Sequence, residues 1–245
     1  MSVEDFLLLE CLYDAEILYL DHWTGRLIHF LRESSRLEDT LVIITSDHGE
    51  NLTEKPVFGH NLYLNEQLLR VPLIVRCRQR FCAGQRITQR VQLLDIFYTI
   101  LETVGLSGWQ RPMQAVRTRS LAEAVSNGDF DSPIFAQYHG LRATPDDERH
   151  KLRYPEVDFE PFDRPSYAVI KGQYKLIYTP GHGGKLYNLS SDPTETTDLY
   201  KSEPEIAEGL RFLLYESFKS QLDVAEGERD IDPEVERRLA DLGYI

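Results

Sequence analysis

The 245-residue chain has little cysteine and no long apolar run. Its three cysteines, Cys11, Cys77 and Cys82, form no CxxC pair, and their odd number argues against a disulfide framework, so reduced thiols are expected. No segment approaches the roughly 20 apolar residues of a membrane span. The first residues also lack the basic, apolar and small-residue order of a signal peptide. These absences predict a cytoplasmic protein that does not enter a membrane.

Positive charge is also scarce. Lysine and arginine number 27 against 40 aspartates and glutamates, which gives a formal net charge of −13. Nucleic acids and anionic membrane surfaces attract basic proteins, so this balance argues against both as partners. An anionic ester would need local positive charge from a metal or from basic side chains to overcome the global field. A hydrophobic content of 42% is ordinary for a soluble globular protein of one or two domains.

Metal-binding side chains follow a short run of β-branched residues. Leu41–Thr45 predicts a strand buried on both faces, and Asp47, His48 and Gly49 come just after it. Ligands of open α/β sheets bind beyond the carboxyl ends of the strands. A carboxylate beside an imidazole is a donor set that a divalent metal uses. The alternative is a strand that ends in an ordinary polar turn.

Apolar periodicity elsewhere predicts alternating helices and strands. A long amphipathic helix is expected over Tyr13–Ser34, with His22 and His29 on one exposed flank, since no carboxylate completes a ligand set there. A helix over Asp95–Val104 is expected to begin at Asp95 or just before it and to end at Gly105. Its predicted core stripe comprises Ile96, Phe97, Ile100, Leu101 and Val104. Further elements are a helix over 62–69, a strand over 70–76 and a strand over 133–138 that ends at His139.

The last third of the chain predicts a small antiparallel sheet. Two alternating runs over Tyr167–Tyr178 flank Gly172-Gln173, which suits a type II′ hairpin. Leu186–Leu189 is expected to add a strand, and Ile206–Val224 a helix that packs across the sheet. Pro233 is expected to open a final helix.

Several ordered motifs together resemble the C-terminal half of the sulfatase family, within the alkaline-phosphatase-like superfamily of metal-dependent ester hydrolases. They are Thr40–Glu50, Phe58-Gly-His60, Leu69–Val75, Lys185–Leu199 and the closing Leu239–Ile245. The resemblance implies a partial alkaline-phosphatase-like α/β sandwich with a mostly parallel sheet. It also implies a small antiparallel C-terminal sheet packed by a helix. In the family the arginine at position 70 is a structural anchor near the site.

The resemblance also implies roles for particular side chains. Asp47 and His48 correspond to ligands of a divalent metal, which could be calcium, manganese or zinc. His60 lies thirteen positions after Asp47, where phosphonate and phosphate-ester relatives carry a lysine or histidine that meets the substrate oxygens. It could also protonate the leaving oxygen as a general acid. Lys55 is a weaker candidate for the same electrostatic role, and His139 corresponds to a loop near the substrate pocket.

The family's nucleophile motif is missing from this sequence. Sulfatases convert the first residue of a Cys- or Ser-x-Pro-x-Arg motif to formylglycine, and an earlier aspartate pair completes their metal site. Neither feature precedes Tyr13. The nearest pattern, Cys82–Arg86, has glycine where the motif needs proline, and we interpret it as a surface loop.

Two functions follow from these observations. The first is a metal-dependent hydrolase of sulfate, phosphate or phosphonate esters; a histidine at position 48 resembles the relatives that act on phosphonates or phosphodiesters with manganese or zinc. The alternative is a catalytically incomplete module or a split-enzyme subunit, with a partner chain or a second copy over an open sheet edge. The expected organisation is an α/β part over 1–140, a charged surface insertion over 141–165 and a small β subdomain over 166–245.

Overall fold

The computed structural model describes residues 3–52, 58–60, 62–106, 119–126, 132–140, 151–152, 155–224 and 237. Contacts divide the chain into two compact units. The first unit comprises 1–61, 67–112 and 118–130, and the second comprises 62–66, 113–117 and 131–245. The predicted Lys55 and the helix expected at Pro233 lie outside the described residues.

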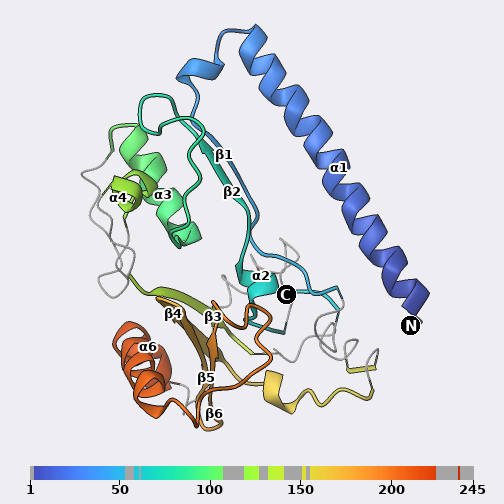
Figure 1. Ribbon diagram of the computed structural model, residues 1–245, viewed down its shortest axis with the longest axis vertical. Helices are drawn as coiled ribbons and strands as arrows, with labels where there is room; N and C mark the ends of the chain where they lie inside the picture. Colours follow the sequence, from blue (N-terminus) through green and yellow to red (C-terminus); the bar gives the residue numbers. More distant parts are fainter. Residues whose placement is uncertain are drawn as a thin grey trace. The chain divides into compact units, whose positions relative to one another are not determined.

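The first unit holds the long N-terminal helix and one pair of strands (Figure 1). Its elements are α1 (Val3–Glu33), η1 (Leu37–Asp39), β1 (Val42–Thr45), most of α2 (Glu66–Leu69), β2 (Leu73–Arg76), α3 (Leu93–Thr103) and α4 (Leu121–Ser126). Among the described residues, no helix is both long and apolar enough to cross a bilayer.

Both strands predicted in this unit are present, but they pair in the opposite sense to the expected sheet. Strand β1 runs antiparallel to β2, with Val42 opposite Arg76 and Thr45 opposite Leu73. Throughout the described ranges every strand pairing is antiparallel, so the expectation of a mostly parallel sheet is not met there. Strand β1 is only partly buried, and Thr45 is exposed, so the prediction of a strand buried on both faces is wrong.

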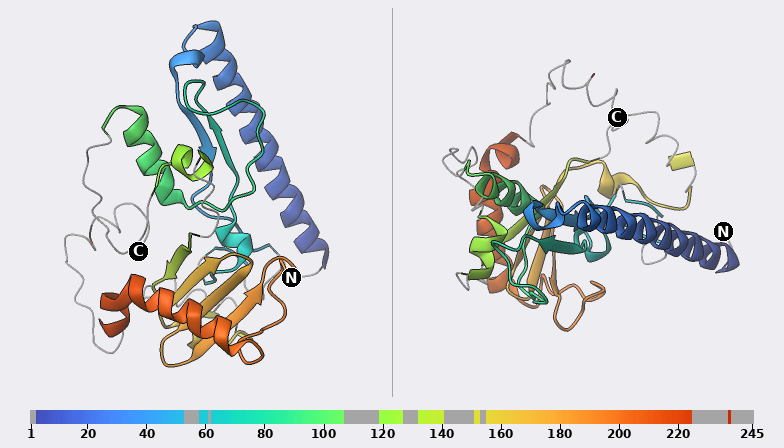
Figure 2. Two further views of the ribbon diagram at one scale, coloured as in Figure 1. Left: turned by 60° about the vertical axis from the view of Figure 1, so that its left-hand side comes forward. Right: turned by 90° about the horizontal axis from the view of Figure 1, so that it is seen from above.

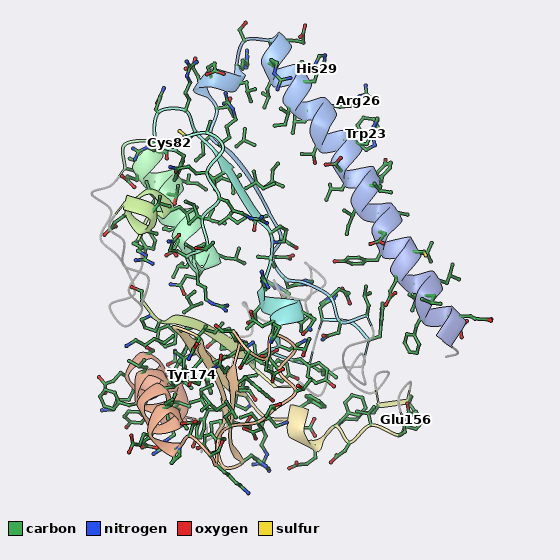
Figure 3. All side chains as sticks on the ribbon, viewed as in Figure 1. Trp23, Arg26, His29, Cys82, Glu156 and Tyr174 are labelled. Carbon is green, nitrogen blue, oxygen red and sulfur yellow. The ribbon has the colours of Figure 1, made fainter. Side chains whose placement is uncertain are left out.

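Helix α1 begins at Val3, ten residues before the predicted start at Tyr13. It ends at Glu33, where Ser35 takes the left-handed conformation with φ of 56°. The apolar stripe of the amphipathic pattern is present but exposed; it includes Ile17, Leu20, Trp23 and Leu27. Figure 3 shows the side chains of Trp23, Arg26 and His29 extending from the C-terminal half of this helix.

Helix α3 begins two residues before the predicted start at Asp95, ends beside Gly105 as predicted, and buries a different face. The N-cap is Gln92, whose backbone N–H donates to Asp95 in a capping box. Gly105, with φ of 80°, closes the helix, since its N–H and that of Leu106 donate back to the carbonyls of the last turn. The prediction that the apolar stripe of this helix forms a core is wrong, because Phe97, Ile100 and Val104 are exposed.

The buried side chains of α3 are polar instead, because they bind the segment before α4. Asp95 and Thr99 are almost inaccessible to solvent. Thr99 Oγ1 accepts a hydrogen bond of 2.8 Å from the backbone N–H of Leu121, and an Asp95 carboxylate oxygen lies 3.4 Å from the N–H of Arg119. Burial raises the pKa of Asp95, while the backbone N–H groups of Gln92 and Arg119 oppose the shift.

The second unit is built on a four-stranded antiparallel sheet. Its strands are β3 (Ile134–Tyr138), β4 (Ser166–Lys171), β5 (Tyr174–Thr179) and β6 (Gly183–Asn188), in that order, with η2 (Glu160–Phe162) before β4. The hairpin predicted at Gly172 is confirmed, since that glycine has a φ of 57° and Lys171 pairs with Tyr174. The predicted strand before His139 exists, but it pairs with β4. The division of the chain at residues 140 and 165 stays a prediction.

Helix α6 (Pro204–Val224) covers one face of this sheet, as the sequence predicts (Figure 2). The residues between sheet and helix form one apolar core; those fully or nearly fully buried are Tyr167, Val169, Leu176, Leu186, Ala207, Leu210, Leu214 and Phe218. The backbone leaves helical geometry at Phe218, whose ring packs against Phe135 and Tyr167. Burying these side chains supplies the main stabilising term of the unit, about 1.5–3 kcal/mol for each large apolar residue.

The loop after β6 depends on the carboxylate of Asp192. Its Oδ2 accepts hydrogen bonds of 2.8 Å from the backbone N–H groups of Thr196 and Thr197, and its Oδ1 accepts one of 3.0 Å from the Thr196 hydroxyl. The hydrogen bond from the Thr197 N–H is the largest effect, and it lowers the pKa of Asp192 below its ordinary 3.8. The hydrogen bonds from Thr196 also lower this pKa, while slight burial acts to raise it.

This lowered pKa predicts a pH-dependent contribution to stability. A depressed carboxyl pKa stabilises the folded state above the unfolded pKa, and the contribution is lost as pH falls through the folded value. Asp192→Ala should therefore lower the free energy of unfolding clearly at pH 7 and much less below about pH 3, which is under the unfolded aspartate pKa of about 3.9. Urea unfolding followed by circular dichroism at both pH values measures this. An equal loss at both would contradict it.

Candidate functional site

The candidate site begins where β1 ends. Asp47 and His48 lie two and three residues beyond Thr45, and Asp47 is largely exposed. The loop is held by its own polar groups: the Ser46 hydroxyl donates to the His48 carbonyl at 2.6 Å, and the His48 N–H donates to Asp47 Oδ1 at 3.0 Å. The sequence predicts this placement from the abrupt end of the β-branched run.

The His48 ring is oriented by the backbone. Its Nδ1 lies 2.9 Å from the carbonyl oxygen of Gly49, and a carbonyl can only accept, so Nδ1 carries the proton and donates. The other nitrogen, Nε2, lies 3.8 Å from Asp47 Oδ2. Metal-binding histidines commonly donate their second nitrogen to a carbonyl or carboxylate in this way. Two ligands of one divalent ion, each about 2.0–2.2 Å from it, are separated by roughly 3–4 Å. The pair therefore fits two positions of a metal site.

Electrostatics favours the same reading of Asp47. Partial burial works to raise the pKa of this carboxyl, but the nearby His48 ring and the His48 N–H outweigh it and lower the pKa below the ordinary value. A carboxylate that is ionised at neutral pH is the form that binds a cation. Among the described residues, no cluster of three or more histidine, cysteine, aspartate or glutamate side chains has metal-binding geometry. Within the described part of the chain, Asp47 and His48 are thus two candidate ligands without a third.

Gly49 permits the close approach of α2 to this loop. Its N–H donates to the Leu68 carbonyl at 2.8 Å. A Cβ at position 49 would lie 1.9 Å from the backbone carbonyl oxygen of Gln67, a separation that no side-chain rotation relieves. Only glycine fits here without a movement of the backbone.

We expect Gly49→Ala to displace the loop and to lower the free energy of unfolding by about 1–3 kcal/mol, the usual cost of overpacking. Gly25→Ala is the matched control, because Gly25 lies inside α1 with nothing within 4 Å of an added Cβ. That substitution should stabilise the helix by up to about 1 kcal/mol. Urea unfolding of both variants measures the difference, and equal effects would contradict the close contact.

A short antiparallel bridge brings a second histidine to the site. Asn51 and Gly59 exchange backbone hydrogen bonds of 3.2 and 3.0 Å, and Gly59 has a φ of 112° that favours glycine. The bridge places His60 against the loop after β1. Its ring stacks on the ring of His48 with the centroids 4.2 Å apart and the planes 23° apart.

Sequence reasoning assigned no role to Glu50, which is the partner of His60. Glu50 Oε2 lies 2.9 Å from His60 Nδ1, and the Glu50 side chain is only 18% exposed against 43% for the His60 side chain. Glu50 and His60 come together because they flank the Asn51–Gly59 bridge. The bridge has no periodic sequence pattern, so the sequence does not predict this contact.

The other predicted residues belong to several elements of the described chain. His139 belongs to the second unit, where its Nε2 lies 3.3 Å from the Gln137 amide nitrogen. Arg70 is exposed beside β2. His22 and His29 are exposed on α1, as the interpretation of an exposed flank predicts. Cys82 is exposed in a segment without helix or strand, which agrees with the surface-loop interpretation.

Comparisons with known proteins find sulfatases and related hydrolases. Residues 11–106 match the family model described as Sulfatase. The choline-sulfatase of Rhizobium meliloti is 28% identical over 197 residues, which is 76% of this chain and 32% of that protein. The multifunctional alkaline phosphatase superfamily protein PehA of Trinickia caryophylli is 29% identical over 202 residues, or 76% of this chain and 35% of that protein. The chain therefore spans about a third of the length of these relatives.

Solved structures show the same fold. The phosphonate monoester hydrolase of Agrobacterium radiobacter matches with a TM-score of 0.69 at 21% identity, over 90% of this chain and 43% of that one. BT4656, solved with its substrate D-glucosamine-2-N,6-O-disulfate, matches with a TM-score of 0.68 at 23% identity, over 86% and 41%. Residues 11–106 thus match the sulfatase family model, and the chain is similar in sequence to sulfatases and in fold to a sulfatase and a phosphonate monoester hydrolase.

Proposed function

We propose that this chain supplies part of the site of a divalent-metal-dependent hydrolase of sulfate, phosphate or phosphonate esters. The observation that carries the proposal is the cluster of Asp47, His48 and His60 at the end of β1, in which two ligand-type side chains lie beside a stacked imidazole. The match of residues 11–106 to the sulfatase family model supports the reaction class. Because the chain covers about a third of its curated relatives, the activity of the whole protein belongs to the same proposal.

Each of the three side chains has a distinct part. Asp47 contributes an anionic oxygen and His48 contributes Nε2, and together they would hold a calcium, manganese or zinc ion. When bound, such an ion supplies positive charge that stabilises the charge developing on the ester oxygens. His60 meets the ester, either by donating a hydrogen bond to a non-bridging oxygen or by protonating the leaving oxygen. The net charge of −13 makes this local positive charge necessary for binding an anion.

Formylglycine does not fit the residues present. The 245 residues contain no Cys- or Ser-x-Pro-x-Arg motif, so no position of this sequence offers the family's nucleophile. This absence supports the second candidate function, a module that binds metal and ester but depends on a different chain for the nucleophile. The two candidates share the site of Asp47 and His48 and differ in turnover by the isolated chain.

The release of nitrophenol by the purified chain distinguishes them. Aryl sulfate, phosphate monoester, phosphodiester and phosphonate monoester would each be tested with calcium, manganese or zinc and with a chelator. Turnover that requires a metal and is lost in Asp47→Ala supports the hydrolase. No turnover, with metal still bound, supports the incomplete module. Turnover that survives both the chelator and Asp47→Ala would overturn the proposed site.

The substrate class follows from the relatives only as a proposal. Their names include a choline-sulfatase and a phosphonate monoester hydrolase, so both sulfate and phosphonate esters belong in the test. We infer a small-molecule ester as the substrate, since Asp47, His48 and His60 form a compact cluster at one loop.

A further inference from the structure

Glu50 is a mostly buried carboxylate at the site, and none of the roles assigned so far involves it. In the sequence it lies between the candidate metal ligands, Asp47 and His48, and the bridge residue Asn51. Its Oε2 is 2.9 Å from His60 Nδ1. Its side chain is mostly covered while that of His60 is nearly half exposed. The covered acceptor therefore sits behind the more exposed ring.

The backbone fixes this arrangement. The Asn51–Gly59 bridge joins the residue after Glu50 to the residue before His60, and Asn51 is fully buried. A Cβ on Gly59 would lie 3.7 Å from Glu50 Oε1, which shows how closely the carboxylate follows the bridge. Two backbone hydrogen bonds therefore hold Glu50 and His60 close together, so their contact does not depend on side-chain conformation alone.

Both imidazoles of the stack then have the same nitrogen engaged. His48 Nδ1 donates to the Gly49 carbonyl, and His60 Nδ1 lies at hydrogen-bond distance from a carboxylate, which can only accept. In each ring Nε2 is the nitrogen that remains to meet a ligand. A carboxylate behind an imidazole fixes its tautomer and its orientation.

We propose that Glu50 is a positioning residue that holds the Nδ1–H of His60, so that Nε2 is the nitrogen that faces the ester and, when the ring holds both protons, the one that donates to it. Glu50 does not touch the reacting atoms and acts through the ring. This role rests on the proposed function, because only an ester in the site gives Nε2 a partner. The tautomer itself exists in the free chain, so it is measurable without metal or substrate.

Long-range proton–nitrogen correlation spectra of the full chain, labelled with nitrogen-15, test the proposal. They would be recorded near pH 8.5, about two units above the ordinary histidine pKa of about 6.5. The His60 signals are assigned by their loss in His60→Gln. In the wild-type chain we expect the pattern of a proton on Nδ1 for His60. A wild-type pattern with the proton on Nε2 would overturn the proposal by itself.

Glu50→Leu, which keeps the approximate bulk and removes the acceptor, should abolish this preference and populate both tautomers of His60. His48 is the internal control, since its Nδ1 donates to a backbone carbonyl and should keep its proton in both proteins. Unchanged His60 signals in Glu50→Leu would overturn the proposal. Absence of both metal binding and ester turnover, in contrast, would count against the proposed function and would leave the tautomer result readable.

Discussion

Lys175→Met is expected to lower the free energy of unfolding of the second unit by about 3–5 kcal/mol, the usual cost of breaking a buried ion pair from one side. Lys175 is completely buried, and its Nζ lies 2.8 Å from Glu195 Oε1 and 3.2 Å from Glu66 Oε1. Both glutamate side chains are less than a tenth exposed. Without the ammonium group, two carboxylates would be left close together in a medium of low dielectric constant.

The sheet explains why a lysine can be buried at this point. Leu176, the next residue of β5, belongs to the core under α6, so the alternation of a strand turns Lys175 to the opposite face. There the Glu195 carboxylate also accepts a hydrogen bond of 2.7 Å from the backbone N–H of Glu66. The loop after β6 and the segment at 62–66 are thus tied to the sheet through one charged cluster.

Hydrogen exchange of the β5 amides measures this local free energy directly. Lys185→Met is the matched control, because Lys185 is exposed on the neighbouring strand β6 and should cost no more than about 0.5 kcal/mol. Lys175→Met combined with Glu195→Gln should recover part of the loss, since glutamine keeps an acceptor for the Glu66 N–H and removes one uncompensated charge. If Lys175→Met costs no more than the control, the cluster does not stabilise the unit.

The largest expected effect on function is the loss of metal binding in Asp47→Ala. Removing a ligand should weaken binding at least as much as removing a supporting residue does, which costs on the order of 10–100-fold. We therefore expect a fall in affinity for zinc or manganese of about 100-fold or more. The alanine also removes the acceptor of the His48 N–H, which adds to the effect by loosening the loop.

Isothermal titration of each metal into the purified chain measures this prediction. Asp39→Ala is the control: Asp39 is an exposed aspartate in η1, and its removal should leave the affinity unchanged. Metal binding should also raise the melting temperature of the wild-type chain and not that of Asp47→Ala, because a ligand that binds only the folded state stabilises it. Equal affinities in the two variants would rule out Asp47 as a ligand.

Much of the fold was predictable because it is set by local patterns. The Gly172 turn, the alternation of the C-terminal strands and the apolar stripe of α6 depend on neighbours in sequence, and the structure confirms them. The location of Asp47 and His48 was predictable for the same reason, since a β-branched run that stops at a carboxylate marks a strand end.

The errors have a common physical cause. Ile17 and Leu20 on α1, and Phe97 on α3, have the spacing of core residues, yet they are exposed in the structure. Periodicity indicates which face is apolar but not what covers it. Tertiary hydrogen bonds determine which face of α3 is buried, because the Thr99 hydroxyl accepts a hydrogen bond from a backbone N–H 22 residues away in the chain. The partnership of Glu50 with His60 was missed because it depends on a bridge between two non-periodic residues.

The most direct test of the central claim is to identify the atoms around a bound metal. Zinc K-edge X-ray absorption on the zinc-loaded chain should show a nitrogen and oxygen shell at about 2.0–2.2 Å, with the outer-shell scattering of an imidazole. That imidazole contribution should fall in His48→Ala. A sulfur shell at about 2.3 Å, or a spectrum unchanged in His48→Ala, would place the metal elsewhere and contradict the assignment of Asp47 and His48.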